Sequence, residues 1–359
     1  MDKEENIVEG MLEARWVEVV DVFRVESANI NAGEGGPTEI DVKTIHLEDG
    51  TVVPRISPQA IFRMIRDYWI DEEEKVDIAR EEAGKAAPLP ECDPKKFIDD
   101  DLFGYLKARG GRTGETGVSE SRSGPIRSVG AIGMFEYPDD IDFMTSIISP
   151  TKKEAGGAMV TRRIYTNTFI LPIWCDMRRV GREAIPQKDK TLKFKNIVDS
   201  KERKKRFQKF LKAIFYLGKF APGAYKQPLP PKLLMIGVFS KPNIMLYDAL
   251  QNDLTVRLKE VRLQKEFDER RNEEKVVSIA SGKVVFSIEL NSLLEKINLY
   301  ANDIINIYIG IMESFFDKSV KDYQEEINSL LNKNDSLKVL KGKIRIKRLS
   351  DLKNNLLSS

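Results

Sequence analysis

Hydrophobic and polar residues alternate over short stretches of the first two thirds of the chain, a pattern typical of strands with one buried face. Trp16 to Glu26 is rich in valine, and Glu39 to His46 places Ile40 and Val42 on one side. Further strands are predicted at Thr51 to Ile56, Ile126 to Phe135, Ile164 to Trp174 and Lys232 to Phe239.

Three segments between these strands are rich in glycine and polar residues and predict loops. They are residues 29–37, 107–125 and 149–157. The last lies between the apolar segments Phe143–Ile148 and Met159–Trp174. This arrangement predicts a long β-hairpin arm with a flexible tip.

Helices are predicted where apolar residues recur every three or four positions. Ser57 and Pro58 form a strong helix start, since serine suits the N-cap and proline is tolerated at the first helical position. Ile61, Ile65 and Trp69 would form its apolar stripe. The spacing predicts a second helix over Lys201 to Leu217.

The last third of the chain has a different pattern. Glu260 to Glu274 reads as a charged, exposed helix or linker. From Leu290 to Phe315 the apolar positions alternate steps of four and three, which predicts a long helix with a heptad seam. The seam suits either the chain's own core or a helix of a partner. Lys341 to Arg348 alternates cationic and apolar residues, like an edge strand.

Composition narrows the class of protein. The 359 residues are 41% hydrophobic and 32% charged, and the net charge is +2, so basic residues must share one face if the chain binds nucleic acid. No apolar run approaches the roughly 20 residues that span a membrane, and the acidic start of the chain does not resemble a signal peptide. Cys92 and Cys175 do not form a disulfide framework, which favours a reducing cytoplasm.

The sequence has few residues or motifs typical of an active site. The sequence has one histidine (His46), no Walker loop and no cysteine pair with zinc-ligand spacing. The glycines of residues 33–36 lie in a strand–loop–strand context, which is wrong for a dinucleotide site. Asp99, Asp100 and Asp101 are adjacent and would point in different directions on a helix, so we interpret them as helix N-terminal acids. We therefore expect no enzyme, no metal and no cofactor.

Three segments, in this order and spacing, carry a resemblance to a known family. They are the loop Asn29-Ile-Asn-Ala-Gly-Glu-Gly-Gly36, the helix start Arg55-Ile-Ser-Pro-Gln-Ala-Ile-Phe-Arg-Met-Ile-Arg66, and Asp99-Asp-Asp-Leu-Phe-Gly-Tyr105, followed by Ser123-Gly-Pro-Ile-Arg127. The chain resembles the repeating backbone subunit of a CRISPR Cascade complex, in the Cas seven family, DevR branch, over residues 16–240. The resemblance suggests a type I system, I-B or I-A like.

The resemblance implies an α+β fold, with a modified RNA-recognition-motif (ferredoxin-like) palm and a helical C-terminal region. The palm with its insertions would cover residues 1–240, with fingers near 68–123 and a thumb hairpin near 145–163. Residues 241–359 would be a charged linker, a long helix and a basic tail that complete or decorate the palm.

The implied function is to bind CRISPR RNA along its backbone, kink it with the thumb and present guide bases to target DNA in antiviral defence. The implied partners are CRISPR RNA, target DNA paired to the guide, copies of the chain itself, and Cascade subunits of the Cas five, Cas six and large-subunit families. Amide and guanidinium donors suit phosphate, and an apolar thumb residue such as Met159 could wedge between bases. The candidate RNA-binding residues are Ser27, Asn29, Asn31, Arg55, Ser57, Gln59, Arg63, Arg66, Arg122, Arg127, Lys152, Lys153, Met159, Arg162 and Arg163.

These residues could also have no part in RNA binding. The arginines of the helix at Ser57 suit a solvated helix face, and Lys152 and Lys153 suit a charged hairpin tip. Two other functions also remain open. One is a type III-like subunit that cuts target RNA with Asp41, which the pattern places within a strand. The other is a stand-alone RNA-binding regulatory protein.

Overall fold

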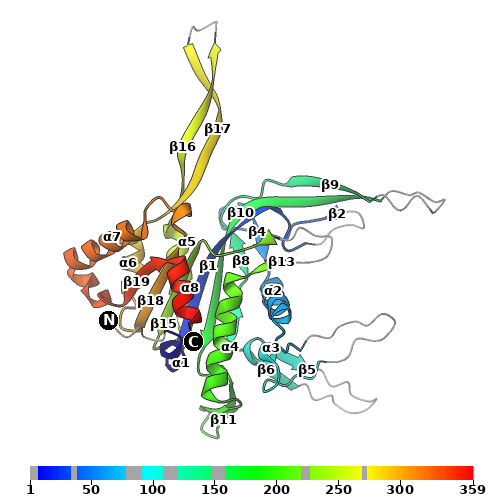
Figure 1. Cartoon of the computed structure of the whole chain (residues 1–359), viewed down its shortest axis with the longest axis vertical. Coiled ribbons are helices and arrows are strands. Elements are labelled where there is room, and N and C mark those ends of the chain that lie inside the picture. The colour runs from blue at the N-terminus through cyan, green and yellow to red at the C-terminus, as the bar shows by residue number, and fades with distance from the viewer. Residues whose placement is uncertain are drawn as a thin grey trace, which may run out of the picture.

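The computed structural model describes residues 7–33, 39–77, 90–107, 120–146, 158–219, 227–268 and 273–358. A central mixed sheet runs through this part of the chain in the order β19-β18-β15-β1-β10-β8-β4-β3 (Figure 1). Its strands are β1 (Trp16–Ala28), β3 (Thr44–His46), β4 (Val52–Ile56), β8 (Ala131–Gly133), β10 (Ala158–Asp176), β15 (Leu233–Phe239), β18 (Ile304–Ile311) and β19 (Ile344–Arg348). Three more strands pair with β10, namely β2 (Glu39–Ile40), β7 (Ile126–Ser128) and β9 (Asp140–Ser146).

Strand β1 lies at the centre of the sheet, antiparallel to β10 on one side and to β15 on the other. Val19 and Phe23 point to one hydrophobic core, and Val20 and Val22 to a second. Because both faces are covered, β1 needs apolar residues at successive positions, which explains its run of valines.

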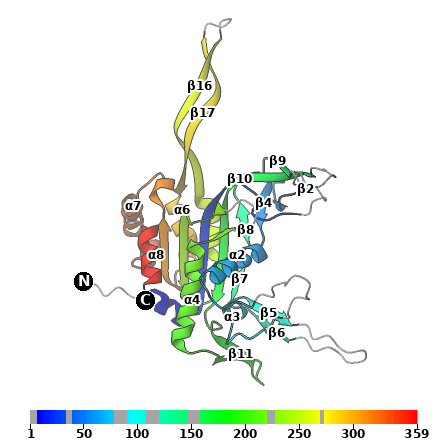
Figure 2. The ribbon, with the colours of Figure 1, turned by 45° about the vertical axis from the view of Figure 1, so that its right-hand side comes forward.

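Helices cover both faces of the sheet, as Figures 1 and 2 show. The core that contains Phe23 also contains residues of α1 (Ile7–Glu13), α2 (Pro58–Asp71), α4 (Ser200–Phe215) and α8 (Leu349–Leu357). The other core contains residues of α5 (Met245–Asp253), α6 (Leu290–Asn298) and α7 (Val320–Lys333). The predicted mixed α+β fold class is therefore confirmed. No helix in the described segments is long and apolar enough to cross a membrane.

Several hairpins leave this body. The longest, β16 (Leu254–Asp268) with β17 (Glu273–Ile288), projects away from the sheet, and β9 with β10 forms a second arm (Figure 2). Smaller hairpins are β5 (Gly104–Lys107) with β6 (Glu120–Ser123), β11 (Arg182–Pro186) with β12 (Leu192–Asn196), and β13 (Gly218–Lys219) with β14 (Gln227–Pro228). The remaining short elements are α3 (Ile98–Leu102) and two 3-10 helices, η1 (Glu313–Phe315) and η2 (Asp335–Leu340).

Most of the predicted elements are present. The predictions for β1, β4, β10, β15 and α4 are confirmed, and so is the helix start at Ser57, whose hydroxyl accepts from the N–H of Ala60. The predicted arm is the β9–β10 hairpin, although its tip, residues 147–157, lies outside the described residues. Residues 39–46 and 126–135 each form two short strands rather than one.

The break within residues 126–135 has a clear cause at Gly130. Its φ is 89°, a left-handed conformation that interrupts an extended strand. A Cβ there would lie 2.2 Å from the carbonyl oxygen of Ile56, so β8 approaches β4 at a position that only glycine fits.

The expectation for the last third was wrong in two places. The described part of the segment predicted as a helix or linker, residues 260–268 and 273–274, lies instead in the paired strands β16 and β17. The heptad pattern is not one long helix: α6 ends at Asn298, and Ile304–Ile311 forms β18 between β15 and β19. The basic tail is an edge strand as predicted, since β19 pairs with β18 at the end of the sheet.

Candidate nucleic-acid interface

The loop after β1, the start of α2 and the base of the β9–β10 arm meet at one end of the sheet. Asn31 ties the loop to the helix, because its side-chain oxygen accepts from the backbone N–H of Ser57 at 2.7 Å. Asn29 ties the loop to the arm, because its amide donates to the carbonyl oxygens of Asp41 and Arg163 at 2.9 and 3.1 Å. These contacts bring the first two motifs of the sequence together in space.

The same contacts change the roles expected for the two asparagines. We expected their amides to bind RNA, but Asn29 is buried and donates within the fold. Asn31 uses its oxygen on Ser57, and its amide donates to the carbonyl oxygen of Ala32. In this structure both residues shape the loop instead of facing outward.

The start of α2 divides into structural and exposed residues. Ser57 is buried and caps the helix, and Arg55 donates to the carbonyl oxygen of Val129 at 2.9 Å. Gln59 and Arg63 are exposed, as is Ser27, which has a φ of 48°. We call Ser27, Gln59 and Arg63 the loop–helix surface. Arg63 pairs with Asp67 one turn later, and an exposed pair of this kind costs little to open.

The two arginines at the base of the arm are engaged within the protein. Arg162 is buried and donates to the carbonyl oxygen of Asn29. Arg163 lies among three carboxylates, those of Glu39, Asp41 and Asp139. The hydrogen bonds that Arg163 donates to Asp139 and Glu39 raise the pKa of its guanidinium. The three acids would have to release Arg163 before it could hold a phosphate.

We expected Asp41 to lie within a strand. It lies instead between β2 and the isolated bridge at Val42. Its carboxylate is 2.8 Å from Arg163. Within the described residues, no group of three or more His, Cys, Asp or Glu is placed to hold a metal ion.

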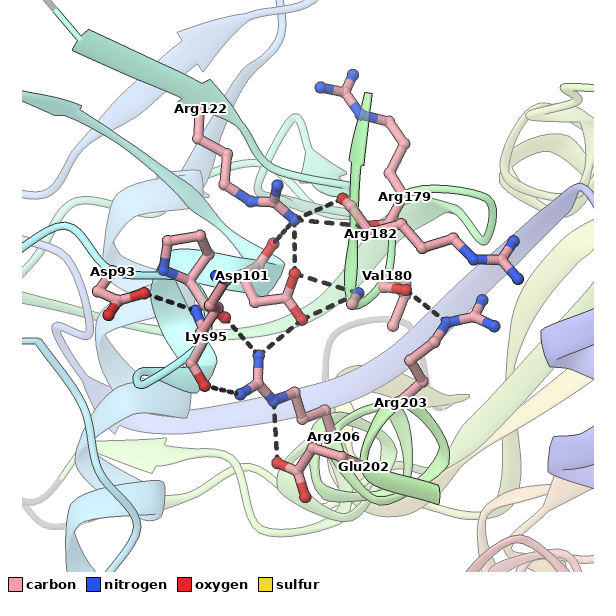
Figure 3. Close-up of polar contacts among 12 residues, drawn as sticks. Asp93, Lys95, Asp101, Arg122, Arg179, Val180, Arg182, Glu202, Arg203 and Arg206 are labelled. Atoms are coloured by element: carbon pink, nitrogen blue, oxygen red, sulfur yellow. Dashed lines mark hydrogen bonds and ion pairs between the residues drawn. The ribbon is translucent and has the colours of Figure 1, made fainter. Parts of the chain in front are cut away.

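Arg66 and Arg122 lie deeper and were predicted for RNA. Arg66 pairs with Asp99 at 2.9 Å and stacks over the ring of Phe103. Arg122 is almost buried and pairs with Asp101 at 2.6 Å (Figure 3). In this structure both guanidinium groups hold α3 and the β5–β6 hairpin to the rest of the protein.

The three aspartates lie in the first turn of α3, as predicted, and all three are buried. Asp101 accepts from Arg122, Arg206 and the N–H of Gly181. Burial raises its pKa, and the two arginines oppose that rise. Burial also raises the pKa of Asp100 to about 7, aided by Asp99 and Asp77.

Sequence reasoning missed this network. A signal was available in retrospect: Arg203 and Arg206 lie one turn apart on the apolar side of α4, where a solvated face would not place them. Buried arginines need buried acceptors: Arg206 pairs with Asp101, and Arg203 donates to the carbonyl oxygens of Val180 and Met177.

The remaining predicted residues lie elsewhere. Arg127 is exposed on β7, opposite Trp174 of β10, and so about 35 Å along β10 from Arg163. Lys152 and Lys153 lie outside the described residues, and Met159 is described only as part of β10. The candidate residues are thus spread over α2, β6, β7 and β10 and do not converge on one pocket. This spread suits an extended nucleic-acid strand better than a small molecule.

Comparison with known proteins gives one family match. The family described as "CRISPR-associated negative auto-regulator DevR/Csa2" matches residues 65–256, which include the second half of α2, the base of the arm and α4. No curated protein matches the chain.

Solved structures give further matches. A chain titled "CRISPR RNA-guided surveillance complex" is 14% identical, with 88% of this chain and 99% of that chain covered and a TM-score of 0.47. A chain titled "CRISPR RNA-guided surveillance complex, pre-nicking" is 13% identical, with 88% and 100% covered and a TM-score of 0.48.

Proposed function

This chain belongs to the CRISPR-associated DevR/Csa2 family, and from that premise we propose that it is a repeating, non-catalytic subunit of a CRISPR RNA-guided surveillance complex. The observation that carries the proposal is the family match, which runs from the second half of α2 through the arm base and α4. The proposed partners are CRISPR RNA, target DNA, further copies of the chain and other subunits of the complex.

We further propose that the body is a modified RNA-recognition motif. Along the chain its elements follow the order β1-α2-β8-β10-α4-β15, and in the sheet β15-β1-β10-β8, with all neighbours antiparallel. This is the split βαβ arrangement of ferredoxin-like folds. An ordinary motif of this type binds bases on its open sheet face, but here α5 and α6 cover that face.

RNA must therefore lie on the edges and insertions of the sheet. The loop–helix surface offers Gln59 and Arg63 as donors, and the β9–β10 arm is the proposed thumb that crosses and kinks the RNA held by a neighbouring copy. Contacts of this kind go to the phosphate and sugar, so the guide bases stay free to pair with target DNA.

Length-dependent assembly tests the repeating role. In sedimentation with synthetic RNAs of increasing length, a repeating subunit adds copies in regular steps, because affinity accumulates along one strand. One protein per RNA at every length would contradict this role. It would favour a stand-alone regulator, the reading that the family description also suggests.

Asp41 would be the catalytic residue if the chain instead cut target RNA. Its engagement with Arg163 supports a structural role, so we expect no RNA cleavage with or without divalent metal. Metal-dependent cutting that disappears in Asp41→Ala would reverse this assignment.

Arg63 tests the loop–helix surface. Arg63→Glu should weaken RNA binding at least about tenfold while leaving the fold intact, because its ion pair with Asp67 is exposed. Lys321→Glu is the matched control, since Lys321 also forms an exposed pair with the residue four positions later. Fluorescence anisotropy with labelled RNA compares the two; equal losses would remove Arg63 from the interface.

A further inference from the structure

A dense basic surface lies away from the loop–helix surface. Between residues 182 and 205 the sequence has nine Lys or Arg and four Asp or Glu. The six exposed lysines of this segment, which we call the β11–β12 lysine surface, are Lys188, Lys190, Lys193, Lys195, Lys201 and Lys205.

The acids of the segment are largely committed to local structure. Asp189 accepts from the N–H and hydroxyl of Thr191 in the hairpin turn. Asp199 caps α4 by accepting from the N–H of Glu202, and Glu202 pairs with Arg206. The fourth acid, Glu183, lies opposite Lys195 across the hairpin. Nine cations against four acids still leave the segment with an excess of five positive charges.

The hairpin stands on a rigid base, drawn in Figure 3. Asp101 accepts from the N–H of Gly181, and Arg122 donates to the carbonyl oxygens of Arg179 and Arg182. Arg203 donates to the carbonyl oxygen of Val180 at 2.7 Å. The buried network thus fixes the two residues before β11, so the lysines are presented on a pre-organised support.

The β11–β12 lysine surface is also separate from the proposed thumb. In Figures 1 and 2 the β11 hairpin and the first turn of α4 lie at the lower end of the molecule, and β9 lies toward the upper right. One RNA strand held at the thumb base does not need this surface.

The side chains of the hairpin favour a duplex over a single strand. Its exposed large apolar residues are Ile185 and Leu192, whereas its aromatic residue, Phe194, is half-buried beneath Arg178. Single-strand sites use exposed aromatic rings on which bases stack. Lys193 and Lys195 instead lie about 6.6 Å apart on one face of a strand, an arrangement that contacts phosphates without reading bases.

We propose that the β11–β12 lysine surface binds the phosphate backbone of double-stranded DNA, independently of RNA. The inference adds a second nucleic-acid site to the proposed function, and its evidence does not depend on the thumb or on the family.

The test removes four charges and keeps polar side chains at the four positions. A variant with Lys188→Gln, Lys190→Gln, Lys193→Gln and Lys195→Gln is compared with a control carrying Lys321→Gln, Lys333→Gln, Lys338→Gln and Lys341→Gln, all exposed in the C-terminal region. The full chain, with whatever nucleic acid it carries, is titrated with a 30-base-pair DNA duplex over a range of salt concentrations. Circular dichroism checks that both variants fold.

We expect the hairpin variant to bind the duplex at least about tenfold more weakly than the control, with a salt dependence reduced by about 2 to 4 counterions. RNA binding should be unchanged. Duplex binding equal to that of the control overturns the proposal, and so does a matching loss of RNA binding, because the surface would then belong to the RNA site. If the wild type binds the duplex through these lysines but holds no RNA, the inference survives and the proposed function fails.

Discussion

Asp101 holds α3 to two distant parts of the chain, the β5–β6 hairpin through Arg122 and α4 through Arg206. A buried carboxylate of this kind is stable only while its cationic partners remain, since removing one leaves charge without compensation. The electrostatics of this region therefore serve the fold first. Arg122, which the motif suggested for RNA, has this structural partner, and its RNA role stays a prediction.

Arg122→Ala should lower the free energy of unfolding by about 3 kcal/mol, near the low end for a broken buried pair because Arg206 still faces Asp101. Arg127→Ala is the control, since Arg127 lies five residues along on the surface and should change stability by less than about 0.5 kcal/mol. Urea unfolding measures both. Equal stabilities would mean that Arg122 is not part of the buried network.

The raised pKa of Glu18 should make the stability of the fold depend on pH. Glu18 is buried on β1, accepts from the N–H groups of Leu246 and Tyr247, and burial raises its pKa to about 7 despite those bonds. Because the folded pKa lies above the unfolded value, the folded state binds more protons between about pH 5 and 7. Stability must then fall as pH rises through this window, by up to about 1.4 kcal/mol per pH unit.

Glu18→Gln should flatten that dependence, because glutamine keeps an acceptor for α5 but does not titrate. Urea unfolding at pH 5.5 and 7.5 makes the comparison, in a range where ordinary carboxylates are already ionised in both states. A variant as pH-dependent as the wild type would assign the effect to the other buried acids, Asp100, whose pKa is raised to about 7, and Asp21, whose pKa burial also raises.

Individual helices and strands differ in how well they can be predicted from their sequences. Local signals were sufficient for α2, where Ser57 and Pro58 mark the start, and for β15, where seven apolar residues match a strand buried on both faces. They failed for β18. Leu290, Leu294 and Ile297 lie on α6, whereas Ile304, Tyr308 and Ile311 lie on a strand, so one heptad spacing ran through two elements.

The candidate site likewise combines features that local sequence signals predict with features that they do not. The motif at residues 55–66 correctly marked a helix start beside a loop, but the loop contacts of Asn29 and the three acids around Arg163 join segments far apart in sequence. No local pattern specifies such partners. Only Gln59, Arg63, Ser27 and Arg127 among the described candidates remain exposed.

Two N-caps provide a test at the scale of elements. Ser57 caps α2 and Ser319 caps α7, where it forms a capping box with Asp322. Ser57→Ala and Ser319→Ala should each lower the free energy of unfolding by about 1 kcal/mol. Because Ser57 is buried, we expect RNA affinity to be equal in the two variants, as measured by anisotropy; a selective loss in Ser57→Ala would return Ser57 to the RNA surface.

At the scale of the molecule, the C-terminal region completes the sheet. β18 and β19 extend it beyond β15, while α5, α6 and α7 cover the face on which an RNA-recognition motif would bind bases. This covering moves the proposed RNA contacts outward, to the loop–helix surface and the β9–β10 arm. It also leaves the β11–β12 lysine surface free for a second nucleic acid.

The central claim is that the chain carries CRISPR RNA as one of several copies. The most direct measurement is to purify the protein natively, record the absorbance ratio at 260 and 280 nm, and sequence the nucleic acid that accompanies it. The account predicts short RNAs of uniform length with ends derived from CRISPR repeats. Protein that is free of nucleic acid and does not assemble on added RNA would contradict it.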